Sequence, residues 1–226
     1  MYIIGGLIKT MAGEDIEDGY LRVGDGKITE IGKRDEMSFH PAPHEQIIEV
    51  REGLIMPGII EAHCHMGITE EKKGMEGDDC NETVNPITPY LRSIDAVNTM
   101  DAAFDDAVRA GITSAMIGPG SSNVVGGQFA FLKTRGRRVD DLIVKAPAAM
   151  KVAFGENPKV NYSGEGKSPS TRMAIAAMLR EELFRAQTYS RKKKKALAAG
   201  EDFEEDFAQE CWLPVLDREI PLKAHV

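Results

Sequence analysis

The stretch LIMPGIIEAHCH, residues 54–65, is an apolar segment that ends in the pattern His-x-His. Pro57-Gly58 inside it predicts a bend, because proline cannot donate to a strand ladder. In an extended chain residues i and i+2 point to the same side, so His63 and His65 can both reach one metal ion. The alternative is two unrelated surface histidines. Because α/β enzymes place reactive groups at the carboxyl ends of strands, the stretch predicts a metal site there.

The residues before this stretch have the pattern of small strands joined by turns. Two short β-rich runs, Tyr20–Val23 and Lys27–Ile31, flank Gly24-Asp25-Gly26. Asp-Gly between two such runs favours a hairpin, because both central turn positions need positive φ. The two prolines and two histidines of Phe39–Glu45 indicate a surface loop. We therefore predict a small β-sandwich segment over residues 1–53.

The pattern changes after residue 54 to short apolar strands separated by helices. Helices are expected over residues 95–110, 171–199 and 203–216, and strands over residues 112–117, 142–152 and 220–226. Ser170 or Thr171 is suited to cap the long helix and Gly200 to end it. Apolar strands between helices favour βα units on a parallel sheet. Residues 54–226 are therefore predicted to form an α/β unit.

Composition and charge narrow the class of protein. The 226 residues carry 28 basic and 36 acidic side chains, and the net charge of −8 argues against a nucleic-acid partner and against an anionic membrane. Three cysteines do not suggest a disulfide framework. The apolar runs are far shorter than the roughly 20 residues of a membrane span. We expect a cytoplasmic protein that forms a homo-oligomer, with no membrane partner.

Residues 57–65 resemble the first-strand metal motif of the amidohydrolase superfamily, usually written P-G-x-x-D-x-H-x-H. Glu61 stands where that family commonly has Asp. Ala110–Ser114 resembles the start of the family's second strand, A-G-x-T-T. Ala153–Lys159 resembles a segment of the imidazolonepropionase-related branch. The hairpin around Asp25-Gly26 is similar to the small β-domain that precedes the barrel in these enzymes.

This resemblance implies an α/β fold with a TIM-like (β/α)8 barrel after the β-sandwich segment. It also implies hydrolysis of C–N bonds other than peptide bonds, in small cyclic or linear amides and amidines. One or two divalent ions, often zinc, would bind water at the carboxyl face of the barrel and lower its pKa.

The resemblance also implies a ligand set, residue by residue. His63 and His65 match the first pair of metal ligands. Glu156 matches the single acidic ligand of the deacetylase branch, and His225 matches the next histidine ligand. Lys151 is the alternative to Glu156, because some members of the family carbamylate a lysine at a strand end.

Part of the family pattern has no counterpart in this sequence. No histidine follows His225, and the final-strand Asp that moves the proton has no match, so no catalytic residue is assigned. About four or five strands follow from His63, where closure of the barrel needs eight. We expect an incomplete barrel, the N-terminal part of an amidohydrolase. The alternative is a non-catalytic metal-binding or assembly protein derived from the same fold.

Overall fold

The computed structural model describes residues 1–37, 41–164 and 166–226, which form two compact units. The first unit is Met1–Gly58 and the second is Ile59–Val226. The division lies within the bend at Pro57-Gly58, a few residues after the end of the predicted β-sandwich segment. No helix in the described ranges combines the length and the apolar character that a membrane span requires.

The first unit consists of short strands in two sheets. The strands are β1 (Tyr2–Ile4), β2 (Leu7–Ile8), β3 (Ile16–Glu17), β4 (Gly19–Gly24), β5 (Lys27–Lys33), β6 (Ile47–Glu49) and β7 (Leu54–Ile55). One sheet has the order β5-β4-β1-β6 and the other the order β3-β2-β7. The predicted hairpin is confirmed: β4 and β5 are antiparallel, and Asp25 and Gly26 have positive φ angles of 50° and 72°. Phe39 and His40 of the predicted surface loop lie outside the described residues.

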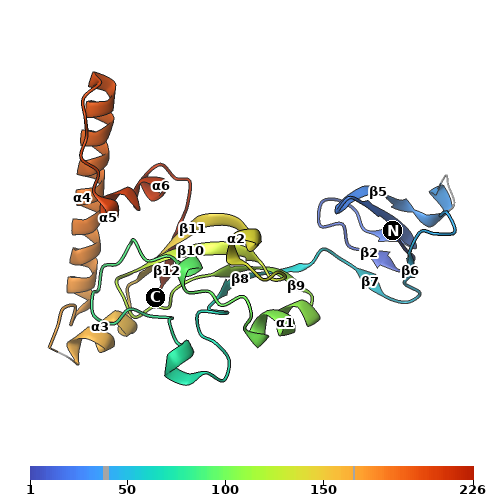
Figure 1. Ribbon diagram of the computed structural model, residues 1–226, viewed down its shortest axis with the longest axis horizontal. Helices are drawn as coiled ribbons and strands as arrows, with labels where there is room; N and C mark the ends of the chain where they lie inside the picture. The colour runs from blue at the N-terminus through green and yellow to red at the C-terminus, as the bar shows by residue number, and fades with distance from the viewer. Residues whose placement is uncertain (38–40, 165) are drawn as a thin grey trace. The chain divides into compact units, whose positions relative to one another are not determined.

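The second unit has a five-stranded sheet with helices packed against it (Figure 1). Its strands are β8 (Ile59–Cys64), β9 (Ile112–Ile117), β10 (Val125–Lys133), β11 (Ile143–Ala153) and β12 (Leu222–His225). Its helices are α1 (Ala102–Arg109), α2 (Val139–Leu142), α3 (Glu156–Ser163), α4 (Arg172–Ala199), α5 (Phe207–Glu210) and α6 (Leu213–Leu216), with short 3-10 turns at Gly74–Gly77 and Ser93–Asp95. The first unit adds one more such turn, at Arg34–Glu36.

The sheet is mixed, with the order β12-β11-β10-β9-β8. The pairs β8/β9 and β11/β12 are parallel, whereas β10 is antiparallel to both of its neighbours. Four strands therefore run in one direction and bring their carboxyl ends to the same edge. Sequence analysis expected this parallel arrangement but gave no strand at β10, which contains Gly126 and Gly127. Gly127, at a φ of 118°, lies at a register shift in the pairing of β10 with β11.

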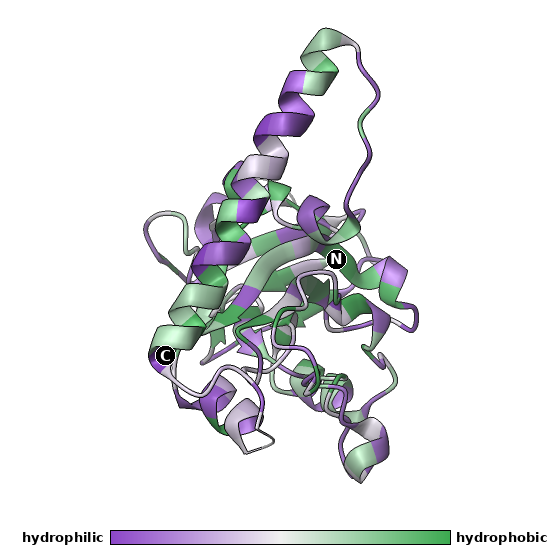
Figure 2. Cartoon of the chain, turned by 90° about the vertical axis from the view of Figure 1, so that its left-hand side faces the viewer, coloured by the Kyte–Doolittle hydropathy of each residue, from purple (hydrophilic) through white to green (hydrophobic). Residues whose placement is uncertain are grey.

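The long helix α4 forms as predicted, and its ends have the expected caps. The Thr171 hydroxyl accepts a hydrogen bond from the amide of Ala174, and Gly200 follows in the left-handed conformation at a φ of 69°. Figure 2 shows a mostly hydrophilic stretch in the half of α4 away from the sheet. Ion pairs with acidic residues hold Lys193 and Lys194 of that half.

The other two predicted helices are shorter than expected. α1 begins at Ala102, because the Asp101 side chain caps it by accepting from the amide of Ala103. The helix predicted over residues 203–216 divides into α5 and α6, and Trp212 lies between them, fully buried.

Trp212 joins α4 to the sheet through one apolar cluster. Its ring packs with buried residues of β10, β11 and α4, among them Val125, Met150 and Leu179. Its indole N–H donates to the buried Glu182 carboxylate on α4 at 3.0 Å. The side chain amide of Gln209 donates to the same oxygen at 3.0 Å. The cluster therefore combines a large apolar surface with a buried carboxylate oxygen that accepts two hydrogen bonds.

The variant Trp212→Phe tests whether the Trp212 cluster holds α4 against the sheet. The change removes one hydrogen bond to a buried carboxylate and leaves part of the cavity empty. We expect the free energy of unfolding to fall by about 2–4 kcal/mol. Urea denaturation followed by circular dichroism measures it. Phe207→Leu, at a residue that is 73% exposed, is the control and should change the free energy by less than about 0.5 kcal/mol. Unchanged stability of Trp212→Phe would show that α4 is held by other contacts.

Candidate metal centre

His63 and His65 lie at the carboxyl end of β8 with their rings close together. The ring centroids are 5.4 Å apart and the planes are nearly perpendicular. Nδ1 of His65 lies 2.7 Å from the carbonyl oxygen of Gly118, which directly follows β9. Because a carbonyl only accepts, Nδ1 carries the proton and Nε2 keeps its lone pair for a metal ion. The parallel pairing of β8 and β9 thus orients one predicted ligand.

The ring of Phe129 on β10 lies next to one of these histidines and to two lysine ammonium groups. Its buried ring lies 5.2 Å from the ring of His63. The ammonium groups of Lys151 and Lys223 lie 5.9 Å and 5.3 Å from the centre of the same ring. Gly118 is required beside it, because a Cβ at that position would be 2.2 Å from the ring of Phe129. Side chains from β8, β11 and β12 therefore all lie next to the ring of Phe129.

The surroundings keep His63 neutral. Burial, followed by the charges of Lys151 and Lys223, lowers the pKa of His63 to about 4. A neutral imidazole is the form that binds a metal ion. A hydrogen bond with the Cys80 side chain raises the pKa of His65.

Lys151 is buried in the middle of the site. It is 1% exposed, and in the part of the chain that the structure describes no hydrogen bond or ion pair joins its ammonium to another group. Burial and the charge of Lys223 lower its pKa. In turn, the charge of Lys151 lowers the pKa of both His63 and His65, and its ammonium and the ring of His63 both lie beside the ring of Phe129. A buried amine without a counter-ion costs free energy and is typical of a functional position.

Of the two remaining predicted ligands, Glu156 lies apart from the histidines and His225 lies near them. Glu156 is the first residue of α3 and is exposed, and no contact joins it to the histidines among the described residues. His225 ends β12 opposite Ala153, and its Nε2 lies 3.3 Å from the side chain nitrogen of Asn157. The charge of His225 also lowers the pKa of His63, so it lies at the rim of the site.

Within residues 1–37, 41–164 and 166–226, no group of three or more His, Cys, Asp and Glu is arranged to hold a metal ion. The structure thus brings together the histidine pair and Lys151, with His225 nearby, but not Glu156. Sequence analysis gave no role to Phe129, Lys223 or Cys80, because no local motif marks them.

The fold and the sequence of the chain have counterparts among known proteins. Over its whole length the chain is similar in structure to an amidohydrolase from Thermotoga maritima MSB8, with a TM-score of 0.91 and 34% sequence identity. It is also 32% identical over 181 residues to amidohydrolase tasK of Hapsidospora irregularis. The chain belongs to the amidohydrolase superfamily. This confirms the family predicted from the His-x-His motif, whereas the imidazolonepropionase-related branch stays a prediction.

A shorter match concerns another member of this class of enzymes. Over 54 residues, 24% of its length, the chain is 35% identical to a 5-methylthioadenosine/S-adenosylhomocysteine deaminase of Nitratidesulfovibrio vulgaris (strain DSM 19637 / Miyazaki F). No family model matches the chain. The chain spans only part of these relatives: 57% of the Thermotoga maritima chain, 18% of tasK and 12% of the deaminase.

Lys151→Met tests whether the buried ammonium of Lys151 lacks a counter-ion. Methionine has a similar length and no charge, so we expect the chelator-treated protein to gain on the order of 1 kcal/mol in free energy of unfolding. Urea denaturation measures it. Lys133→Met, at an exposed position of β10, is the control and should have no effect. A lower stability of Lys151→Met would mean that the ammonium has a stabilising partner.

Proposed function

We propose that the whole protein is a metal-dependent hydrolase of C–N bonds other than peptide bonds, in small amide- or amidine-type substrates. The observation that carries the proposal is the meeting of His63, His65 and Lys151 over the ring of Phe129, at the carboxyl end of parallel strands. The likeness to proteins named amidohydrolase supports the amide class. The likeness to a deaminase supports amidines as well, because a deaminase also hydrolyses a C–N bond.

The proposal includes the architecture. The five-stranded sheet is part of a TIM-like (β/α)8 barrel, in which metal sites lie at the carboxyl face. Two observations support this: four of the strands run in one direction, and a solved amidohydrolase superimposes with a TM-score of 0.91.

Lys151 replaces Glu156 as the anionic ligand of this proposal. Two neutral histidines are too few for a tight zinc site, which takes three protein ligands or more. The neutral amine of Lys151 attacks the carbon of carbon dioxide, a new N–C bond forms, and one proton leaves the nitrogen. The product is a carbamate, whose oxygens are anionic donors. The buried position of Lys151 beside both histidines supports this choice, and the exposed position of Glu156 does not support the other.

A divalent ion, zinc in many members of the family, supplies a water molecule of lowered pKa when it is bound. The chain's own residues prepare that position. The Gly118 carbonyl fixes the orientation of His65, and the ring of Phe129 packs against the ring of His63. Lys223 donates to the carbonyl oxygen of Ala62 at 2.5 Å, which ties β12 to the end of β8. His225, the remaining histidine of the predicted ligand set, is proposed as a further ligand.

Metal binding by the whole protein tests the ligand set. We expect zinc to bind when bicarbonate is present, and His63→Ala, His65→Ala and Lys151→Ala each to weaken it by about a hundredfold. Isotopically labelled bicarbonate should give a carbamate signal by nuclear magnetic resonance that Lys151→Ala lacks. Glu156→Gln is the matched control and should bind zinc as the parent does. Loss of zinc in Glu156→Gln but not in Lys151→Ala would reverse the assignment.

Turnover decides between an enzyme and a non-catalytic metal-binding protein. The second function is a real alternative, because the described residues hold no group of three or more His, Cys, Asp and Glu. We expect the zinc-loaded whole protein to hydrolyse at least one member of a panel of lactams, hydantoins, N-acyl amines and amidines. A chelator should remove this activity and zinc should restore it. Zinc binding without turnover on the whole panel would favour the non-catalytic function.

A further inference from the structure

Lys151 and Lys223 lie directly opposite each other in the parallel pair of strands β11 and β12. Residues paired in this way point to the same face of the sheet. Their ammonium groups lie 5.9 Å and 5.3 Å from the centre of the Phe129 ring, which agrees with this placement. Like charges at opposed positions destabilise a sheet. The pair of lysines therefore has a cost that the packing of the sheet does not explain.

No acidic side chain neutralises the two lysines in the part of the chain that the structure describes. Lys151 is 1% exposed and forms no hydrogen bond or ion pair there. Lys223 forms no ion pair there either, and its ammonium donates to the carbonyl oxygen of Ala62. A buried ammonium without an anion costs free energy. The like-charge pair and the missing counter-ion both indicate that an anionic group belongs beside these lysines.

Lys223 has donors left for such a group. An ammonium carries three N–H donors, and the carbonyl of Ala62 accepts from one of them at 2.5 Å. Ala62 directly precedes His63 in β8, so this hydrogen bond holds the Lys223 side chain at the strand that carries the histidine. Two donors therefore remain, at a fixed place, for the oxygen atoms of an anion.

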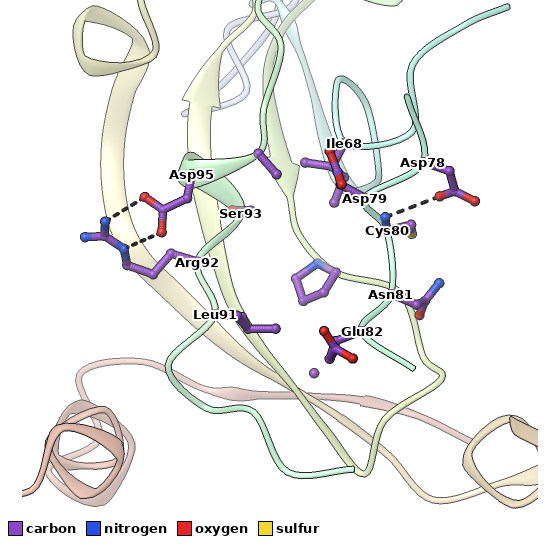
Figure 3. Close-up of a pocket in the computed structure, with 13 residues that line it drawn as sticks. Ile68, Asp78, Asp79, Cys80, Asn81, Glu82, Leu91, Arg92, Ser93 and Asp95 are labelled. Carbon is purple, nitrogen blue, oxygen red and sulfur yellow. Dashed lines mark hydrogen bonds and ion pairs between the residues drawn. The ribbon is translucent and has the colours of Figure 1, made fainter. Parts of the chain in front are cut away.

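A pocket of about 370 Å³ comes close to Lys151 (Figure 3). Gly126 belongs to its lining, and a Cβ at that position would be 3.3 Å from the Cγ of Lys151. The stem of Lys151 thus packs against a residue of the pocket wall that has no side chain. The volume is large enough for carbon dioxide and bicarbonate, so the pocket offers them a way toward the lysine.

We propose that Lys223 is a positioning residue that holds the carbamate of Lys151. The inference rests on the proposed function, in which Lys151 carries that group. In net terms the neutral amine and bicarbonate give the carbamate and water: one N–C bond forms, and one C–O bond of bicarbonate breaks. One carbamate oxygen accepts a hydrogen bond from Lys223, and the other remains for a metal ion. The like-charge pair thereby becomes a pair of opposite charges.

Isotopically labelled bicarbonate and nuclear magnetic resonance test this on the metal-free whole protein. We expect Lys223→Met to need about tenfold more bicarbonate than the parent for the same carbamate signal, because a charge-assisted hydrogen bond is lost. Lys223→Arg keeps the charge and the donors and should restore most of the signal. Lys145→Met is the matched control. Lys145, six positions before Lys151 on β11, also donates to a carbonyl oxygen, that of Glu219, and its loss should leave the signal unchanged.

A double-mutant cycle of Lys151→Met and Lys223→Met separates this role from a structural one. A purely structural Lys223 would couple to Lys151 in the same way with and without bicarbonate. We expect the coupling to change sign, from repulsion in the metal-free protein to attraction at saturating bicarbonate. Urea midpoints of the four proteins under both conditions measure it. Coupling of the same sign under both conditions would overturn the ion pair.

The outcomes distinguish this inference from the proposed function. A parent protein without any carbamate signal would overturn both the Lys151 ligand and this inference. A carbamate that forms equally well in Lys223→Met would overturn this inference alone. A carbamate that depends on Lys223, in a protein without turnover, would support the inference and count against the proposed hydrolase.

Discussion

The ring of Phe129 lies so close to the backbone of Gly118 that no side chain fits between them. This contact holds the site together. The carbonyl of Gly118 orients His65, while the ring of Phe129 carries His63 on one edge and Lys151 nearby. A residue larger than glycine would push the β10 ring away and disturb both histidines. The site therefore depends on how β9 and β10 pack, and not only on the strand that carries the His-x-His motif.

In the proposed centre, charge links the binding of a metal ion to the modification of Lys151. Lys151 and Lys223 both lie over the ring of Phe129 beside the histidines, so the site repels a divalent cation in its unmodified form. Conversion of Lys151 to a carbamate reverses its charge and removes the buried ammonium.

Patterns of neighbouring residues were sufficient to predict part of the fold and part of the candidate site. The hairpin at Asp25-Gly26, the long helix α4 with its caps and the His-x-His strand end follow from neighbouring residues, so sequence analysis could predict them. Strand β10 was missed, because its glycines hide a strand that long-range pairing stabilises. Lys151 stood as the alternative to Glu156, since only the pairing of β11 with β10 and β12 buries it beside the histidines.

A crystal structure of the whole protein, grown with zinc and bicarbonate and measured at the zinc absorption edge, tests the central claim most directly. The account predicts an anomalous peak about 2.0–2.1 Å from one nitrogen of His63 and from Nε2 of His65. It also predicts density that continues from Lys151 Nζ into a carbamate bound to the ion. A peak held by the carboxylate of Glu156, with Lys151 unmodified, would contradict it.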